Sequence, residues 1–193
     1  MAVNTTILTS PARVKTDTPL NDSVDDNLLY PAIVTAQERN CHPLLGTDLF
    51  NKLKTLIAAG EVGDVGNENY QTLLNTYLVP MLVQYTFAEV LPVLRLRFVN
   101  NSVVAMGSEQ STTASYDELK PIMNSANDIG NFYKERAIDY LCYNAASFPE
   151  YTSNSGADLS PTNRNYTQGM NLGPSWNMNQ LSYIRTLLGF DNG

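Results

Sequence analysis

The chain has 193 residues, 43% of them hydrophobic, and a formal net charge of −7 at pH 7. This length suits one domain, or one domain with an extension, and the apolar fraction is sufficient for a core, which excludes wholesale disorder. The acidic balance argues against a protein that grips nucleic acid, because phosphate binding needs clustered lysines and arginines and here they are few and scattered.

Residues 1–22 are predicted to form an extended N-terminal arm. The segment "VNTTIL" is rich in β-branched residues and suits an edge strand. Pro11 and Pro19 disfavour a helix in the rest of the arm.

A helical body is predicted over residues 23–148. Its first helix begins near Ser23, a capping residue followed by two aspartates that suit the positive end of a helix dipole, and it ends before Pro43. A second helix covers residues 44–59 and ends at Gly60, which suits the left-handed conformation that follows a helix. The apolar stripe of this second helix is Leu45, Leu49, Leu53, Leu56 and Ile57.

The third helix, about residues 68–91, is the most apolar. Pro80 is expected to kink it, because a proline removes one helical hydrogen bond and crowds the preceding turn. The alternating sequence "LRLRF" at residues 94–98 fits a strand and equally the irregular end of this helix, and both interpretations stay open. Residues 93–113 as a whole predict a short strand, a loop and a second strand, forming a small β-hairpin.

A long helix closes the body. Ser115 and Glu118 form the pattern of a capping box at its start, although a start at Lys120 would make the next residue, a proline, the first helical one. The helix is expected to run to about Phe148 with one broad apolar face. That face comprises Leu119, Ile122, Met123, Ala126, Ile129, Phe132, Tyr133, Ala137, Tyr140, Leu141, Ala145 and Phe148. The fold class is therefore mainly α: a helical bundle body with a small β-hairpin element and extended N- and C-terminal arms.

Residues 149–193 are predicted to be an extended C-terminal arm that docks between subunits. The stretch at residues 147–176 is rich in Pro, Gly and polar residues, yet the chain then continues with the apolar sequence "LSYIRTLLGF". Such a segment cannot bury a core of its own and is expected to order against another polypeptide, with tyrosine and tryptophan as its main contacts. The candidate interface residues in this arm are Tyr151, Tyr166, Met170, Leu172, Trp176, Met178, Tyr183, Ile184, Leu187, Leu188 and Phe190.

Arg95 and Arg97 are the tightest basic pair in the chain. If their segment is extended, both side chains point to the same face, because alternate residues of a strand share a side. That face is either solvated or a contact with a partner protein, and we include both arginines among the candidate interface residues.

The sequence contains few residues that could form a catalytic or metal-binding site. Cys41 and His42 could form a nucleophile and a base, but neighbours in sequence rarely face each other and no family signature surrounds them. Two cysteines and one histidine do not supply a zinc site, and no phosphate-binding glycine loop is present. Glu89, an acid in an apolar stretch, is expected at a rim or subunit contact. We predict no enzymatic activity, no cofactor and no metal; a hydrolase using Cys41 and His42 is a distant alternative.

The N-terminal sequence lacks the basic start and apolar run of a secretory signal. The most apolar region, residues 77–96, is interrupted by Gln84, Glu89 and two prolines and falls short of the roughly 20 clean apolar residues of a spanning helix. We therefore expect no membrane association. Cys41 and Cys142 are expected to be free thiols in a reducing cytosol.

Three stretches together resemble a known family. They are "YPAIVTAQERNCHPLLGTDLFNKLKTLI", then "NYQTLLNTYLVPMLVQYTFAEVLPVLRLRFVNNSVV", and the close of the long helix, "YLCYNAASFPEY". The layout, over about residues 28–151, resembles head–tail connector (adaptor) proteins of tailed bacteriophages, of the kind found in crAss-like and Bacteroides-infecting phages. These are packing and turn residues, and no catalytic residue is carried over.

The resemblance implies a structural virion protein that forms a cyclic ring, commonly of twelve copies, beneath the portal vertex. It implies three sets of partners: the portal protein above, neighbouring copies of the same chain, and tail-side connector or tail proteins below. Double-stranded DNA would pass through the centre without sequence-specific binding. The expected location is the head–tail junction of the virion, after assembly in the bacterial host cytoplasm. The alternative from another class is a soluble scaffolding or regulatory module that binds a host or phage protein through its C-terminal arm.

Overall fold

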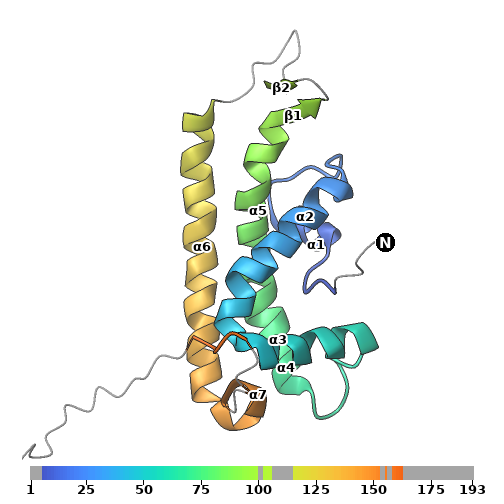
Figure 1. The fold of residues 1–193 in the computed structure, drawn as a ribbon, viewed down its shortest axis with the longest axis vertical. Coiled ribbons are helices and arrows are strands. Elements are labelled where there is room, and N and C mark those ends of the chain that lie inside the picture. Colours follow the sequence, from blue (N-terminus) through green and yellow to red (C-terminus); the bar gives the residue numbers. More distant parts are fainter. Residues whose placement is uncertain (1–5, 100–101, 106–114, 153–154, 156–157, 163–193) are drawn as a thin grey trace, which may run out of the picture.

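The computed structural model describes residues 6–99, 102–105, 115–152, 155 and 158–162 (Figure 1). Nearly all of the secondary structure is helical, so the mainly α fold class is confirmed. In chain order the elements are α1 Pro11–Asp17, α2 Asp26–Ala36, the π-helix η1 Gln37–Cys41, α3 His42–Ala59, α4 Glu68–Thr72, the π-helix η2 Leu73–Leu78, α5 Val79–Arg95, β1 Leu96–Val99, β2 Ser102–Ala105, α6 Tyr116–Tyr143, the 3-10 turn η3 Ala145–Ser147 and α7 Pro149–Thr152.

Helix α5 lies at the centre of the bundle. It packs along α6 on one side and against α2 on the other (Figure 1). This position follows from its composition, because nine of its residues are buried, including Met81, Leu82 and Val90. Each such side chain contributes about 1.5–3 kcal/mol when it is fully buried, so α5 organises the core.

Helix α6 begins as its sequence predicts. The Ser115 hydroxyl accepts a hydrogen bond from the Glu118 backbone N–H, and the Glu118 carboxylate accepts one from the Ser115 N–H at 2.7 Å, so the capping box is confirmed and the alternative start at Lys120 is wrong. The helix ends at Tyr143 rather than near Phe148, because a 3-10 turn follows it. Phe148 lies beyond that turn and is fully buried.

The first two predicted helices are joined into one helical path. Asp25, and not Ser23, caps α2, and the π-helix η1 carries the path into α3. Pro43 lies in the first turn of α3, where a missing N–H is tolerated. The interruption comes instead at Gly46, whose φ of 74° and ψ of 163° are not helical. Gly60 ends α3 in the left-handed conformation, as predicted.

Pro80 is accommodated by a widened turn. The π-helix η2 ends at Leu78, directly before Val79 and Pro80 begin α5, and helical residues run on from Glu68 to Arg95. By length and composition alone this continuous helix could cross a membrane, but 56% of its most apolar window is buried inside the protein. Burial of this kind is what a core helix requires.

The prediction of an extended N-terminal arm is wrong for the described part of residues 1–22. Ser10 caps the helix α1, and Pro11 occupies its first turn, where proline is favoured rather than excluded. Leu8 and Val14 are buried in the main core. Residues 6–8 find their backbone partners on the buried Gln37, whose side chain accepts from the Leu8 N–H at 2.9 Å and donates to the Thr6 carbonyl at 3.1 Å.

Strands β1 and β2 follow α5 and pair in antiparallel register, with Leu96 opposite Ala105 and Val99 opposite Ser102. The predicted β element spanned residues 93–113. Within that range residues 93–95 end α5, and residues 100–101 and 106–114 lie outside the described residues. The complete hairpin therefore stays a prediction.

Candidate interaction surface

The first part of the predicted C-terminal arm folds back onto the chain's own body. We call the described residues of 149–162 the return segment. Helix α7 packs on α3, and Tyr151 is buried, with its hydroxyl donating to the Thr162 carbonyl at 2.8 Å. The prediction that Tyr151 contacts another subunit is therefore wrong, because the 3-10 turn after α6 directs the chain back toward α3.

The return segment supplies hydrogen-bond partners for the backbone groups that lose theirs at the interruption in α3. In a regular helix the Thr47 N–H would bond to the Pro43 carbonyl four residues earlier. Here the Thr47 N–H donates to the Leu159 carbonyl at 3.0 Å, and the Pro43 carbonyl accepts from the Thr162 hydroxyl at 2.9 Å. Backbone groups released at Gly46 are thus satisfied by residues more than a hundred positions away, as buried or half-buried polar groups require.

Polar side chains also connect α3 to the return segment, and we call all of these contacts around Gly46 the joint. The Asp48 carboxylate accepts from both the backbone N–H and the hydroxyl of Ser155, at 2.6 and 2.7 Å. These hydrogen bonds, the backbone one first, lower the pKa of Asp48 below its ordinary value. The Thr47 hydroxyl accepts from the Leu159 N–H and lies 3.0 Å from Nε2 of His42.

The structure places Cys41 and His42 in surroundings that do not suit a nucleophile and its base. Cys41 is fully buried, and burial raises the pKa of its thiol well above the ordinary range, which suppresses the nucleophilic thiolate. His42 Nε2 lies 3.7 Å from the Asp158 carboxylate of the return segment, and the His42 ring stacks on Phe50, with ring centroids 4.7 Å apart. Among the residues that the structure describes, no cluster of three or more Cys, His, Asp or Glu side chains could hold a metal ion.

Glu89 also has a structural partner. Its carboxylate forms an ion pair with Arg39 of η1, across the contact between α5 and the α2–α3 path. Both side chains reach solvent, so this pair contributes little to stability. The expectation that Glu89 lies at a subunit contact is not tested by this geometry.

The outer side of α6 carries a stripe of mainly apolar side chains that are exposed in the described structure. Its members recur at intervals of three, four or seven residues, the spacing of a helix seam that packs against another helix. We call this set the α6 stripe: Ile122, Ser125, Ile129, Phe132, Arg136 and Tyr143. Large apolar parts of it face solvent, since Phe132 is 57% exposed and Tyr143 is 91% exposed.

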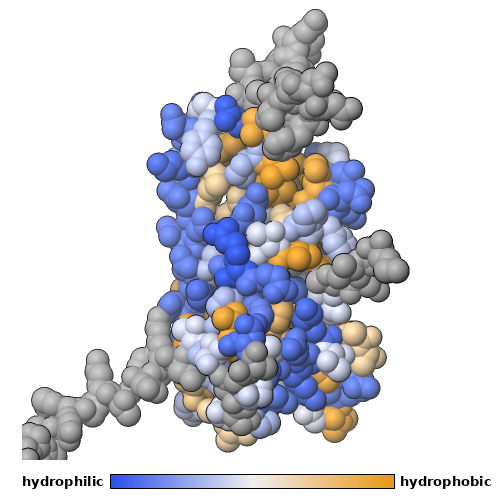
Figure 2. All heavy atoms as spheres, in the orientation of Figure 1, coloured by the Kyte–Doolittle hydropathy of each residue, from blue (hydrophilic) through white to orange (hydrophobic). Residues whose placement is uncertain are grey.

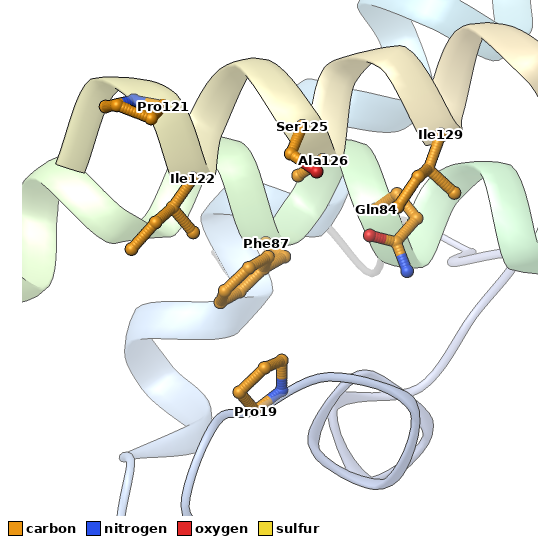
Figure 3. Close-up of a pocket in the computed structure, with 8 residues that line it drawn as sticks. All are labelled: Pro19, Gln84, Phe87, Pro121, Ile122, Ser125, Ala126 and Ile129. Atoms are coloured by element: carbon orange, nitrogen blue, oxygen red, sulfur yellow. The ribbon is translucent and has the colours of Figure 1, made fainter.

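A hollow lies beside the upper half of the stripe (Figure 3). Its volume is about 480 Å³. Ile122 and Ile129 project from α6 at its rim, Phe87 of α5 lies at its base, and Pro19 faces them from the segment before α2 (Figure 3). Figure 2 shows apolar side chains reaching the surface in the upper half of the molecule, among hydrophilic ones. We call the hollow lined by Pro19, Phe87, Ile122 and Ile129 the upper hollow.

The lower half of the stripe is aromatic. The Arg136 guanidinium lies over the rings of Tyr77 and Phe132, at 5.4 and 5.6 Å from their centroids. A second hollow of about 400 Å³ is lined there by Tyr77, Arg136 and Tyr143, among others. Exposed Arg and aromatic side chains of this kind are enriched in the energetic centres of protein interfaces.

Helix α2 exposes a smaller apolar surface. Leu28 and Tyr30 are each more than two-fifths exposed, next to the acidic side chains of Asp25 and Asp26. Because α2 and α6 pack on different sides of α5, this surface and the α6 stripe belong to different sides of the bundle (Figure 1).

Residues 41–160 match DUF6712, a family of unknown function. The chain belongs to the DUF6712 family. No curated protein and no solved structure matches it. The DUF6712 match begins at the junction of η1 and α3 and ends at Ser160, so it includes the return segment except for its last two residues. The match therefore contains the contacts of Ser155 and Leu159 with α3, whereas Thr162, which bonds to Pro43 and Leu44, lies just beyond it.

The predicted interface residues have different outcomes. Arg95 ends α5 rather than lying in a strand, so the expected shared strand face of Arg95 and Arg97 does not exist. The Arg95 Nε is buried without a hydrogen-bond partner in the structure. Arg97 lies in β1 opposite Val104. The other candidates, Tyr166, Met170, Leu172, Trp176, Met178, Tyr183, Ile184, Leu187, Leu188 and Phe190, lie outside the described residues.

Sequence reasoning missed the α6 stripe by merging two faces of one helix. Ala126, Ala137 and Leu141 are buried against α5, whereas Ile122, Ile129 and Phe132 lie on the outer flank. The sequence spacing could have shown this second face. Ile122 and Ile129 are seven residues apart, so they share one side of the helix, and that side differs from the one on which the buried residues lie.

Proposed function

We propose that this chain is a structural subunit of a cyclic head–tail connector ring in a tailed bacteriophage. In this proposal twelve copies dock beneath the portal protein, join the capsid to the tail and surround the DNA channel. The ring contacts tail-side proteins below, and double-stranded DNA passes through it without sequence-specific binding. The protein has no enzymatic role.

The observation that carries the proposal is the pair of exposed apolar surfaces on different sides of α5. A closed ring needs two different surfaces on each subunit, one that meets the preceding copy and one that meets the next. The α6 stripe and the exposed apolar residues of α2 fit that requirement. Their charges also suit each other, since Arg136 belongs to the stripe while Asp25 lies three residues before Leu28; Asp26 already pairs with Lys15.

The resemblance to connector proteins supports the same proposal. It covers about residues 28–151, which in the structure are the helices that build the bundle and the start of the return segment. In the proposal this body carries a small β-hairpin after α5 and a C-terminal arm. Because the return segment belongs to the body, the arm that reaches a neighbour begins after Thr162.

Native mass spectrometry of the full chain, alone and with the portal protein of the same phage, tests the proposal. We expect either a large cyclic oligomer alone or a monomer that joins rings when portal is added. A stable monomer that is indifferent to portal would contradict the connector function. That result would favour a scaffolding or regulatory module that binds another protein.

A further inference from the structure

We infer that the upper hollow beside the α6 stripe receives the segment Leu181–Phe190 from a neighbouring copy of this chain. The inference rests on the proposed ring and adds to it the surface that accepts the C-terminal arm. The occupant is a defined piece of sequence, and the hollow is defined by described residues, so this single contact can be tested within the assembled ring.

The shape of the hollow suits one face of a helix. Ile122 and Ile129, 46% and 42% exposed, form two ridges one heptad apart on α6. Between them lie the short side chains of Ser125 and Ala126, with Phe87 at the base (Figure 3). Large–small–large spacing of this kind accepts the side chains of a second helix as knobs into a hole.

The segment "LSYIRTLLGF" has the complementary spacing. Leu181, Ile184 and Leu188 stand at i, i+3 and i+7 and would share one face of a helix. Ile122, Ser125 and Ile129 stand at the same intervals. An amphipathic helix with anchors at these positions is a common ligand of apolar grooves.

Charge supports the same pairing. On a helix, Arg185 lies at the flank of the face formed by Ile184 and Leu188, and Asp128 lies exposed at the flank of the stripe next to Ile129. These are the positions at which paired helices place opposite charges to fix partner and orientation.

The chain is long enough to deliver the segment. The described chain ends at Thr162, which is hydrogen-bonded to α3. Residues 163–180 then provide 18 residues before Leu181, and these reach up to about 60 Å when extended. This length allows docking on the same copy as well as on a neighbour; the closed ring, in which every copy gives one arm and accepts one, favours the neighbour.

Site-specific photo-crosslinking decides between these routes. A photoreactive benzoyl-phenylalanine replaces Ile129 in the full chain, and the same replacement of Asn124, an exposed residue on another face of α6, is the control. Unlabelled and ¹⁵N-labelled subunits are mixed, assembled and irradiated. We expect residue 129, and not residue 124, to crosslink to peptides from 181–190, with many crosslinked pairs joining a labelled and an unlabelled copy.

Four outcomes would contradict the inference or the connector function on which it rests. Crosslinks only within single copies would overturn delivery by a neighbour, and crosslinks to other segments would overturn the upper hollow as the receiving surface. Ile129→Asp, compared with Asn124→Asp, gives an independent measurement: we expect at least a tenfold loss of assembled rings for Ile129→Asp alone. If Ile129→Asp assembles normally, this inference fails while the connector function stands; if the wild-type chain forms no ring with portal, the connector function fails.

Discussion

Gly46 is the residue at which α3 and the return segment meet. Its φ of 74° with ψ of 163° belongs to a region that is essentially restricted to glycine. A Cβ at this position would also lie 2.8 Å from Cδ of Pro161 and 2.9 Å from its backbone nitrogen. Both the backbone conformation and the close approach of another segment therefore require glycine here.

Gly46→Ala is expected to destabilise the protein by more than about 3 kcal/mol, since strain at such a conformation costs about 1–3 kcal/mol before the clash with Pro161 is added. Gly60→Ala is a matched control, because Gly60 also has a positive φ but no atom lies within 4 Å of its added Cβ. Urea unfolding of both variants measures the difference. Equal losses for the two would show that the contact with Pro161 has no energetic role.

Asp48 makes the joint sensitive to acid. Because the folded-state pKa of Asp48 is lowered by Ser155, the stabilising hydrogen bonds are present above the ordinary aspartate pKa and are lost as the pH falls through the folded-state value. We expect the Ser155 amide resonance to shift with this titration in NMR spectra of the folded chain. Asp48→Asn should abolish the shift. If the Ser155 amide resonance still shifts with pH in the Asp48→Asn variant, the shift is caused by another acidic group.

At the level of elements, α5 and α6 touch through a glycine and an aromatic ring. A Cβ on Gly130 would lie 2.8 Å from Cε1 of Tyr85. That ring has little freedom, since its hydroxyl donates to the Asn131 side chain at 2.7 Å. Burial raises the pKa of Tyr85 to about 12, so the hydroxyl keeps its proton at neutral pH and remains a donor.

Gly130→Ala should therefore lower the melting temperature, although alanine is favoured over glycine in a helix interior by about 1 kcal/mol. The overpacking against Tyr85 costs about 1–3 kcal/mol and outweighs that gain. Ser125→Ala, on the exposed side of the same helix, should leave the melting temperature unchanged or slightly raised. Circular dichroism at 222 nm follows both. A higher melting temperature for Gly130→Ala would contradict this expectation, since it would mean that α5 and α6 move apart to fit the added methyl group without loss of stability.

The sequence predicted the elements whose signals are local. Ser115 and Glu118 located the start of α6, and Gly60 the end of α3, because capping and left-handed turns depend on neighbouring residues. It failed where the partner is distant in the chain. Nothing near Pro11 indicates that Gln37 will bind residues 6–8, and nothing near Tyr151 indicates that Gly46 will release backbone groups for the return segment.

For the whole molecule, the folded body extends beyond the predicted end at residue 148 and includes the return segment as far as residue 162. Two truncated chains test this boundary. A chain that ends at Thr162 should unfold at the same urea concentration as the full chain. A chain that ends at Phe148 should lose on the order of 3 kcal/mol or more, because it lacks the buried Tyr151 ring and the hydrogen bonds to α3.

The same two chains separate folding from assembly. Under the proposed function, the chain that ends at Thr162 keeps its fold but fails to form rings with portal, since it lacks the arm. Analytical ultracentrifugation with portal measures this failure. Full assembly by that chain would remove the arm from the mechanism and leave the surfaces of α2 and α6 as its only basis.

The contact between Pro43 and Thr162 spans 119 positions. A bacterial or eukaryotic ribosome adds about 5–20 residues each second, so the start of α3 waits roughly 6–24 s for the residues that complete it. During that interval its unpaired carbonyl and amide are open to chaperones or to the wrong nascent chain. A chain released or stalled between these two points would therefore leave the start of α3 without its hydrogen-bond partners.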